Sequence, residues 1–282
     1  MTVTAAEGHL VSSDGLKLFY RRWPAPQPRA ICLLVHGIAE HSGRYGHLAE
    51  ALTSHQFDVL ALDHRGHGRS EGRRGDCRSL RQFVEDLHLL AGQARAKVSR
   101  TLPLALVGHS LGGLIALAYA AAYPGSAQAV AVSSPSLKLA HETPPLKVAF
   151  VTAVSRVAPA FHFQNGVNPR HLCHDPAVVR AYETDPLIHR VLSARCAVAL
   201  RQAMLRSQEL AKKLTIPCLI LQAGADELCD PRAAERFAAN GSDSRITFRR
   251  YEGMYHELFN EPEKERAIAD LCTWLDGVLR SC

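Results

Sequence analysis

The sequence has no run of about 18 apolar residues, the length that a membrane-spanning helix needs. Residues 1–18 mix polar and apolar side chains, without the basic start and apolar stretch of a secretory signal. The eight cysteines form no Cys-x-x-Cys pair and are scattered through a chain whose core needs no disulfides. These absences lead us to expect a cytoplasmic protein with reduced thiols.

Nucleotide and metal motifs are also missing. Neither the G-x-x-x-x-G-K-[ST] loop nor the dinucleotide fingerprint occurs, so we interpret the glycine-rich and basic stretch 62–70 as a structural turn. Asp63-His64 and His171-x-x-His174 lack further ligands at a recognisable spacing. We therefore expect no metal and no organic cofactor.

The charge of the chain is unevenly distributed. Of the 282 residues, 47% are hydrophobic and 21% charged, which suits a globular domain with a sizeable core. Residues 138–212 hold ten Lys and Arg against five Asp and Glu, whereas the net charge of the whole chain is +6. Such a distribution is typical of solvated faces, and we expect no nucleic-acid partner. Weak peripheral association of this basic region with a membrane surface is a hypothesis, and the sequence gives no indication of the oligomeric state.

Short apolar runs alternate with longer segments of helical pattern. The runs predict strands at 30–35, 59–62, 104–107, 129–132, 218–221 and 246–248. Helices are predicted at 43–54, 80–98, 111–123, 233–239 and 263–279. This alternation predicts an α/β fold with a mostly parallel central sheet flanked by helices.

The alternation stops between the two halves of the chain. Helix-like segments separated by prolines replace the strand-like runs there. We predict a helical cap at 138–212, inserted between core segments 1–137 and 213–282.

Gly108-His109-Ser110-Leu111-Gly112 matches the G-x-S-x-G nucleophile elbow, in which a serine occupies a tight turn between a strand and a helix. A buried strand is predicted directly before it and an apolar helix directly after it. The context therefore favours Ser110 as a nucleophile over a chance glycine-rich turn.

A serine nucleophile needs a base and a carboxylate, which follow it in the order acid, then histidine. His256 and Asp226 each lie in a loop after a predicted strand, where catalytic groups of parallel sheets are found. Asp230 is the rival acid, but Pro231 follows it, and we assign it to capping a helix.

The oxyanion of such a reaction needs two backbone donors. We predict the amides of Leu111, after the nucleophile, and of Ile38, in the loop after an early strand. His36, in the same loop, is interpreted as a packing residue.

As a set, these motifs resemble the monoacylglycerol lipase and lysophospholipase family of the α/β-hydrolase superfamily, from about residue 15 to the last helix. The matching stretches are HG at 36–37, EHSGRY at 40–45, DHRGHGRS at 63–70, GHSLGG at 108–113, ADELCD at 225–230 and YH at 255–256, whereas Ile38-Ala39 is bulkier than the family's Ala-Gly. The resemblance implies an α/β-hydrolase fold with a cap and a serine carboxylic-ester hydrolase that uses Ser110, Asp226 and His256. It also implies a polar pocket for the glycerol head of a monoacylglycerol, and the matching residues are Glu40, Arg44, His109 and Tyr182.

Other activities remain open on the same residues. The triad suits a lysophospholipase, a small-ester esterase or a hydrolase of carbon–carbon bonds, and a ligand receptor is the alternative outside enzymes. Within the predicted cap, 146–158 is apolar nearly all round. One interpretation is that part of this stretch lines an acyl tunnel or touches a lipid surface. The other is that it forms an ordinary cap core.

Overall fold

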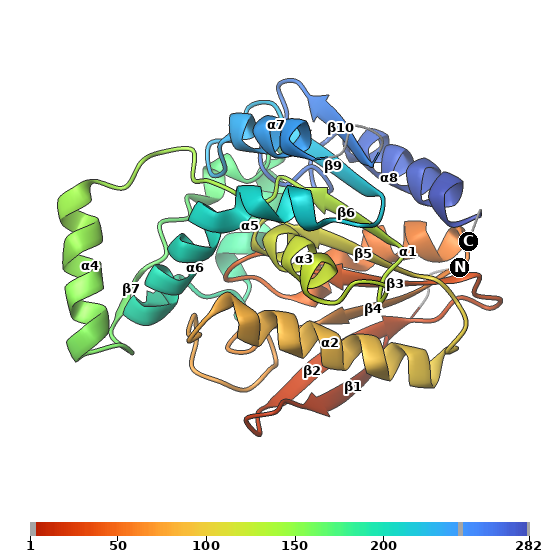
Figure 1. Cartoon of the computed structure of the whole chain (residues 1–282), viewed down its shortest axis with the longest axis horizontal. Helices are drawn as coiled ribbons and strands as arrows, with labels where there is room; N and C mark the ends of the chain where they lie inside the picture. The colour runs from red at the N-terminus through yellow and green to blue at the C-terminus, as the bar shows by residue number, and fades with distance from the viewer. Residues whose placement is uncertain (1–3, 242–244, 281–282) are drawn as a thin grey trace.

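The fold is built on one eight-stranded sheet with the strand order β1-β2-β4-β3-β5-β6-β9-β10 (Figure 1). The computed structural model describes residues 4–241 and 245–280. The strands are β1 (Ala6–Val11), β2 (Lys17–Trp23), β3 (Ala30–Val35), β4 (Phe57–Leu62), β5 (Leu104–His109), β6 (Ala129–Ser133), β9 (Cys218–Ala223) and β10 (Ile246–Tyr251). All pairs from β4 to β10 are parallel, whereas β2 is antiparallel to β1 and to β4.

Helices cover both faces of this sheet. They are α1 (Gly46–Ser54), α2 (Leu80–Lys97), α3 (Leu111–Ala122), α7 (Pro231–Asn240) and α8 (Lys264–Leu279). Side chains such as Phe83, Leu114 and Phe237 place α2, α3 and α7 in one buried cluster. Leu48 and Leu271 place α1 and α8 in the cluster on the opposite face. The predicted α/β architecture with a mostly parallel sheet is confirmed.

Burial explains which strands the sequence revealed. Every residue of β3, β4, β5, β6 and β9 is buried, as expected for strands covered on both faces. The antiparallel strands β1 and β2 were not predicted. β1 is a half-exposed edge strand, so its sequence contains no continuous apolar run.

A long segment between β6 and β9 lies at one end of the sheet. It holds α4 (Pro145–Val157), β7 (His162–Gln164), α5 (Pro176–Thr184), β8 (Val191–Ser193) and α6 (Ala194–Arg206). Two short 3-10 helices, Pro169–His171 and Ser207–Lys213, belong to the same segment, and another, Ser42–Tyr45, lies between β3 and α1. The sequence showed only helix-like segments here, but β7 and β8 form a small antiparallel ribbon. Three-residue strands are too short to produce a periodic pattern.

Helix α4 stands at the outer edge of this segment, farthest from the sheet (Figure 1). None of its residues is buried, although it is rich in valine and alanine and contains Leu146 and Phe150. Within the described residues, no helix is long and apolar enough to cross a membrane.

The stretch after β4 is a turn held by its own hydrogen bonds, as the sequence indicated. The buried carboxylate of Asp63 accepts from the Ser42 amide through Oδ1 and from the Arg69 amide through Oδ2, both at 2.8 Å. The hydroxyl of Ser70 accepts from the Phe19 amide of β2 at 2.8 Å. Asp63 thus ties the loop at the carboxyl end of β4 to the loop after β3.

We expect Asp63→Ala to lower the free energy of unfolding by about 2–5 kcal/mol, because it leaves the buried Ser42 amide and the partly buried Arg69 amide without their acceptor. Urea unfolding followed by circular dichroism measures the loss. Glu85→Ala is the control, since Glu85 forms a surface ion pair with Arg81, and it should cost less than about 0.5 kcal/mol. Equal losses in both variants would contradict this role of Asp63.

Candidate active site

Ser110 occupies a sharp turn between β5 and α3, with φ 53° and ψ −118°. A positive φ is rare for a residue with a side chain and is found where function requires it. The turn also requires glycine on both sides. A Cβ on Gly108 would lie 2.4 Å from the Gly112 carbonyl oxygen, and one on Gly112 would lie 2.0 Å from that of Val35. The G-x-S-x-G spacing therefore has a steric cause here.

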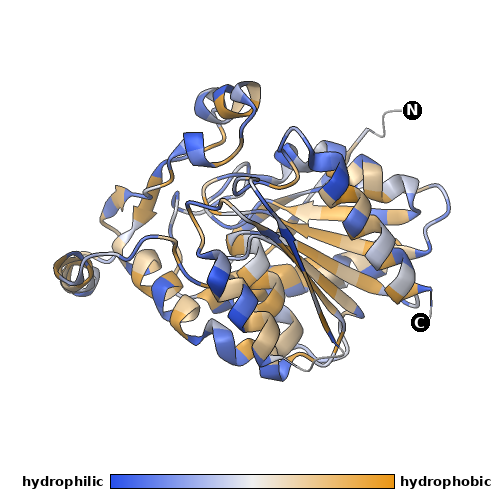
Figure 2. Cartoon of the chain, turned by 90° about the horizontal axis from the view of Figure 1, so that it is seen from above, coloured by the Kyte–Doolittle hydropathy of each residue, from blue (hydrophilic) through white to orange (hydrophobic). Residues whose placement is uncertain are grey.

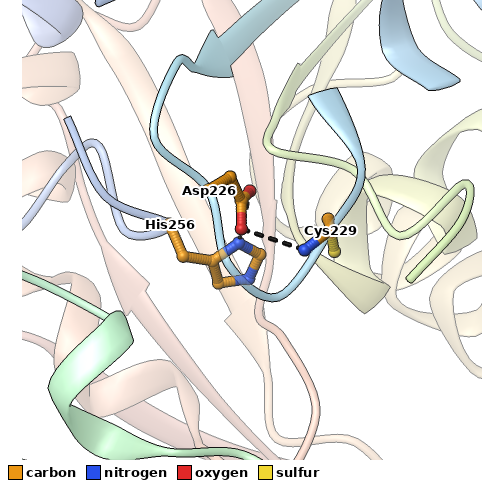
Figure 3. Close-up of side chains that lie close together, drawn as sticks. All are labelled: Asp226, Cys229 and His256. Atoms are coloured by element: carbon orange, nitrogen blue, oxygen red, sulfur yellow. Dashed lines mark hydrogen bonds and ion pairs between the residues drawn. The ribbon is translucent and has the colours of Figure 1, made fainter. Parts of the chain in front are cut away.

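His256 and Asp226 form a buried pair at the same edge of the sheet. Asp226 follows β9 and His256 follows β10, and Nδ1 of the imidazole lies 2.8 Å from Oδ2 of the carboxylate (Figure 3). The amides of Leu228 and Cys229 donate to Oδ1, each at 2.9 Å. An ionised carboxylate only accepts hydrogen bonds, so Nδ1 carries a proton and Nε2 is left for another partner.

The charges of this pair stabilise each other. Burial alone would lower the pKa of His256, but the charge of Asp226 and its hydrogen bond outweigh it and raise that pKa. Burial alone would likewise raise the pKa of Asp226, but His256 and the two amides hold it below its usual value. Asp226 is therefore ionised at neutral pH, and His256 is a stronger base than an ordinary imidazole.

Ser110 and His256 line the same cavity, which has a volume of about 1360 Å³. Within residues 4–241 and 245–280, the hydroxyl of Ser110 has its hydrogen bond with the Ser136 hydroxyl, at 3.1 Å, and none with His256. Ser136 was not among the predicted site residues, because nothing in its local sequence distinguishes it from other loop serines.

The two predicted amide donors lie beside the serine. Leu111 is the first residue of α3, where a helix offers its N–H groups no partner of its own. Ile38 lies in the turn after β3, and both residues line the cavity together with Ser110. This position suits donors to an oxyanion that forms at Ser110.

Three of the four residues expected at the polar pocket, Glu40, His109 and Tyr182, line the cavity. The fourth, Arg44, lies behind them: its guanidinium is 5.0 Å from the centre of the Tyr182 ring, and Nη1 is 2.5 Å from Oε2 of Glu40. The amide of Gly37 donates to the other oxygen of Glu40 at 2.6 Å. Burial and the nearby His256 lower the pKa of His109 to about 4, so His109 is neutral.

Glu257 belongs to the same polar group and was missed by the sequence analysis. Both of its oxygens accept from Arg44, at 2.7 Å each, and its side chain is buried beside the cavity. Although burial opposes ionisation, the Arg44 charge keeps the pKa of Glu257 below its usual range. A glutamate after a histidine carries no sequence signal of burial, so only the structure reveals this ion pair.

The rest of the cavity is largely apolar and lies beneath the segment between β6 and β9. Val148 and Val151 of α4 line it from one side, and Leu200 and Met204 of α6 line it from another. Of the two interpretations of 146–158, the structure favours a wall of the cavity over an ordinary buried core, because no residue of α4 is buried.

Several side chains that could bind a metal ion already have other partners. One atom from each of Asp226, Cys229 and His256 lies within 4.8 Å of the others, but the Nδ1 proton occupies the contact between the imidazole and the carboxylate (Figure 3). Burial raises the pKa of the Cys229 thiol, which disfavours the thiolate that metals bind. His171 contacts Asn168, whereas His174 contacts Glu261. The arrangement therefore suits proton transfer better than metal binding.

Two residues have the structural roles that the sequence suggested. The Nε2 atom of His36 accepts from the His64 amide at 2.9 Å, and its Nδ1 atom lies 2.7 Å from the Gly37 carbonyl oxygen. Asp230 is the N-cap of α7 and accepts from the Arg232 amide at 3.0 Å. Asp226 is thus the acid that contacts His256.

Comparisons with known proteins agree over most of the chain. A family model described as serine aminopeptidase, S33, matches residues 26–263. A monoacylglycerol lipase of Mycolicibacterium smegmatis is 36% identical over 277 residues, which cover 96% of this chain and 97% of that protein. The monoglyceride lipase of Homo sapiens is 36% identical over 264 residues, covering 92% of this chain and 86% of that protein. The crystal structure of Paleococcus ferrophilus monoacylglycerol lipase has a TM-score of 0.84 at 32% identity and covers 92% of this chain and 98% of that one.

We expect NMR titration of the His256 imidazole to give a pKa above the ordinary value of about 6.5. In Asp226→Asn the pKa should fall below that value, because burial then acts without the opposing negative charge. Asp230→Asn is the control, since Asp230 is close in sequence but caps α7, and it should leave the titration unchanged. An unchanged pKa in Asp226→Asn would refute the assignment of Asp226 as the partner.

Proposed function

Because the chain belongs to the serine aminopeptidase S33 family and is a carboxylic-ester hydrolase related to the monoacylglycerol lipases, we propose that it cleaves monoacylglycerols through an acyl-enzyme on Ser110. The family match and the two lipase relatives confirm the family expected from the motifs. The observation that carries the proposal is the buried Asp226–His256 hydrogen bond beside the cavity that Ser110 lines.

The reaction begins at the hydroxyl of Ser110. Its Oγ leaves the contact with Ser136, transfers its proton to Nε2 of His256 and attacks the ester carbonyl carbon. The amides of Ile38 and Leu111 stabilise the oxyanion, and Asp226 stabilises the imidazolium that forms. His256 then protonates the leaving alcohol, and the same steps with water release the fatty acid.

The cavity supports the choice of substrate. Val148, Val151, Leu200 and Met204 offer an apolar wall to an acyl chain. At the other side of the nucleophile, the carboxylate of Glu40 and the hydroxyl of Tyr182 offer polar partners to a glycerol head. A site with one apolar and one polar end matches an ester of a fatty acid with a small polyol.

The segment 138–212 acts as a cap over this site. Its helices α4 and α6 supply cavity residues that the sheet and its flanking helices do not. Its excess of basic residues and the exposed side chains of α4 make it the side that faces a lipid surface. Leu146 is 85% exposed, Phe150 59% and Val157 84%, and α4 stands apart from the body of the molecule (Figure 2).

We expect Ser110→Ala to lower the rate of ester hydrolysis by roughly three orders of magnitude or more, as for other triad nucleophiles. Initial rates on 4-nitrophenyl esters and on monoacylglycerols of increasing acyl length measure the loss and the chain preference. Ser54→Ala, at the exposed end of α1, should behave like the wild type. A wild type without turnover on any ester would instead favour a ligand receptor.

We expect Leu146→Ser/Phe150→Ser to weaken sedimentation with anionic vesicles at least tenfold, because each apolar side chain removed from lipid costs about 1.5–3 kcal/mol. Neither residue lines the cavity, so hydrolysis of a water-soluble ester should be unchanged. Val11→Ser is the control, since Val11 is 68% exposed on β1 and lies away from the cap. Negligible binding of the wild type to anionic and neutral vesicles would exclude membrane association.

A further inference from the structure

Gly75, Asp76 and Cys77, which precede α2, contact the start of α6. The carbonyl of Gly75 accepts from the Ser193 amide at 2.9 Å. The carboxylate of Asp76 accepts from the Ser193 hydroxyl at 2.6 Å and forms an ion pair with Arg195. We call this contact between 75–77 and 193–196 the cap seam, since it joins the core to the cap.

Two thiols face each other at the cap seam. The sulfur atoms of Cys77 and Cys196 are 2.7 Å apart, and both side chains are buried. A separation of 2.7 Å is shorter than the van der Waals contact of two sulfur atoms, whereas a disulfide bond measures about 2.05 Å. Of the cysteines in the described residues, only these two have sulfur atoms within hydrogen-bonding reach of each other.

The contacts around the thiols hold them in place. Ser193 caps α6 by accepting from the Cys196 amide at 3.1 Å, and the same hydroxyl donates to Asp76, the residue next to Cys77. The backbones on both sides are therefore fixed by hydrogen bonds that do not involve sulfur. Joining the two sulfurs requires only a small further approach.

We propose that Cys77 and Cys196 are a modification site, at which oxidation forms a disulfide that fastens the N-terminal end of α6 to the core. The bond would connect positions 119 residues apart in the chain. Because α6 supplies Leu200 and Met204 to the cavity, the disulfide would also restrain one wall of the acyl site, a consequence that rests on the proposed function.

A peroxide is the oxidant that fits this site, because it is small enough to reach a buried thiol when the cap seam opens. The peroxide oxidises one thiol to a sulfenic acid and is itself reduced to water. The second thiol then attacks that sulfur, the S–O bond breaks as the S–S bond forms, and a second water leaves with the thiol proton. The two thiols lose two electrons and two protons in total.

The surroundings of Cys196 make its oxidation depend on opening of the cap seam. The hydrogen bond with Cys77 and burial raise the pKa of Cys196 well above its ordinary value. Since the thiolate is the reactive form, the closed seam protects Cys196, and burial shields both sulfurs from solvent. Opening of the seam exposes both sulfurs to solvent, and closing it returns them to contact.

The test compares the folded protein before and after treatment with hydrogen peroxide, by mass spectrometry of the intact chain and of its peptides. We expect the loss of two hydrogen atoms, one cross-linked peptide pair containing Cys77 and Cys196, and reversal by dithiothreitol. The midpoint of thermal unfolding should rise on oxidation by an amount on the order of 5 °C.

Variants separate this pair from the other thiols. Cys77→Ala and Cys196→Ala should each abolish the cross-link and the rise in the midpoint, whereas Cys218→Ala, in β9, should retain both. Free Cys77 and Cys196 after treatment, a cross-link to other cysteines, or equal midpoints of the oxidised and reduced protein would overturn the proposal. These readouts do not use ester hydrolysis, so they stand or fall independently of the proposed function.

Discussion

The burial of the parallel sheet on both faces is the constraint on which the rest of the structure depends. Strands covered by helices on either side are nearly continuous apolar runs, and their polar loops are confined to the two ends. The loops at the carboxyl end carry Ser110 after β5, Asp226 after β9 and His256 after β10. The residues of the proposed triad thus lie at the same end of the sheet, and Ser110 and His256, more than 100 positions apart in sequence, line one cavity.

Two histidines line that cavity, and the carboxylate of Asp226 gives them different pKa values. The rings of His109 and His256 are 4.7 Å apart and both are buried. Burial lowers the pKa of His109 to about 4, whereas Asp226 reverses the effect of burial at His256 and raises its pKa. His109 therefore stays neutral, whereas His256 can hold the proton that the proposed mechanism requires of it. Next to these histidines, the positive charge of Arg44 is paired with the carboxylates of Glu40 and Glu257.

The sequence could predict those parts of the fold and site that leave a local pattern. Fully buried strands such as β3 and β9 are apolar runs, and the elbow at Ser110 needs glycines at fixed positions for a steric reason. The half-exposed strand β1 and the short ribbon of β7 and β8 leave no such pattern. Glu257 and Ser136 were missed because their roles depend on partners distant in sequence, Arg44 and Ser110, which only the folded chain brings together.

The cap is attached unequally along its length, and this determines which part of it can move. At the cap seam, the start of α6 is joined to the core by a hydrogen bond and an ion pair of Asp76, whose side chain is 8% exposed. Helix α4 packs against α6 and has no buried residue, so little apolar surface opposes its displacement. Displacing α4 would open the apolar end of the cavity, because Val148 and Val151 form part of its wall, and the contacts of the cap seam need not break. On the proposed function, access for a fatty acyl chain is thus easiest on the side of α4, which is also the side proposed to contact lipid.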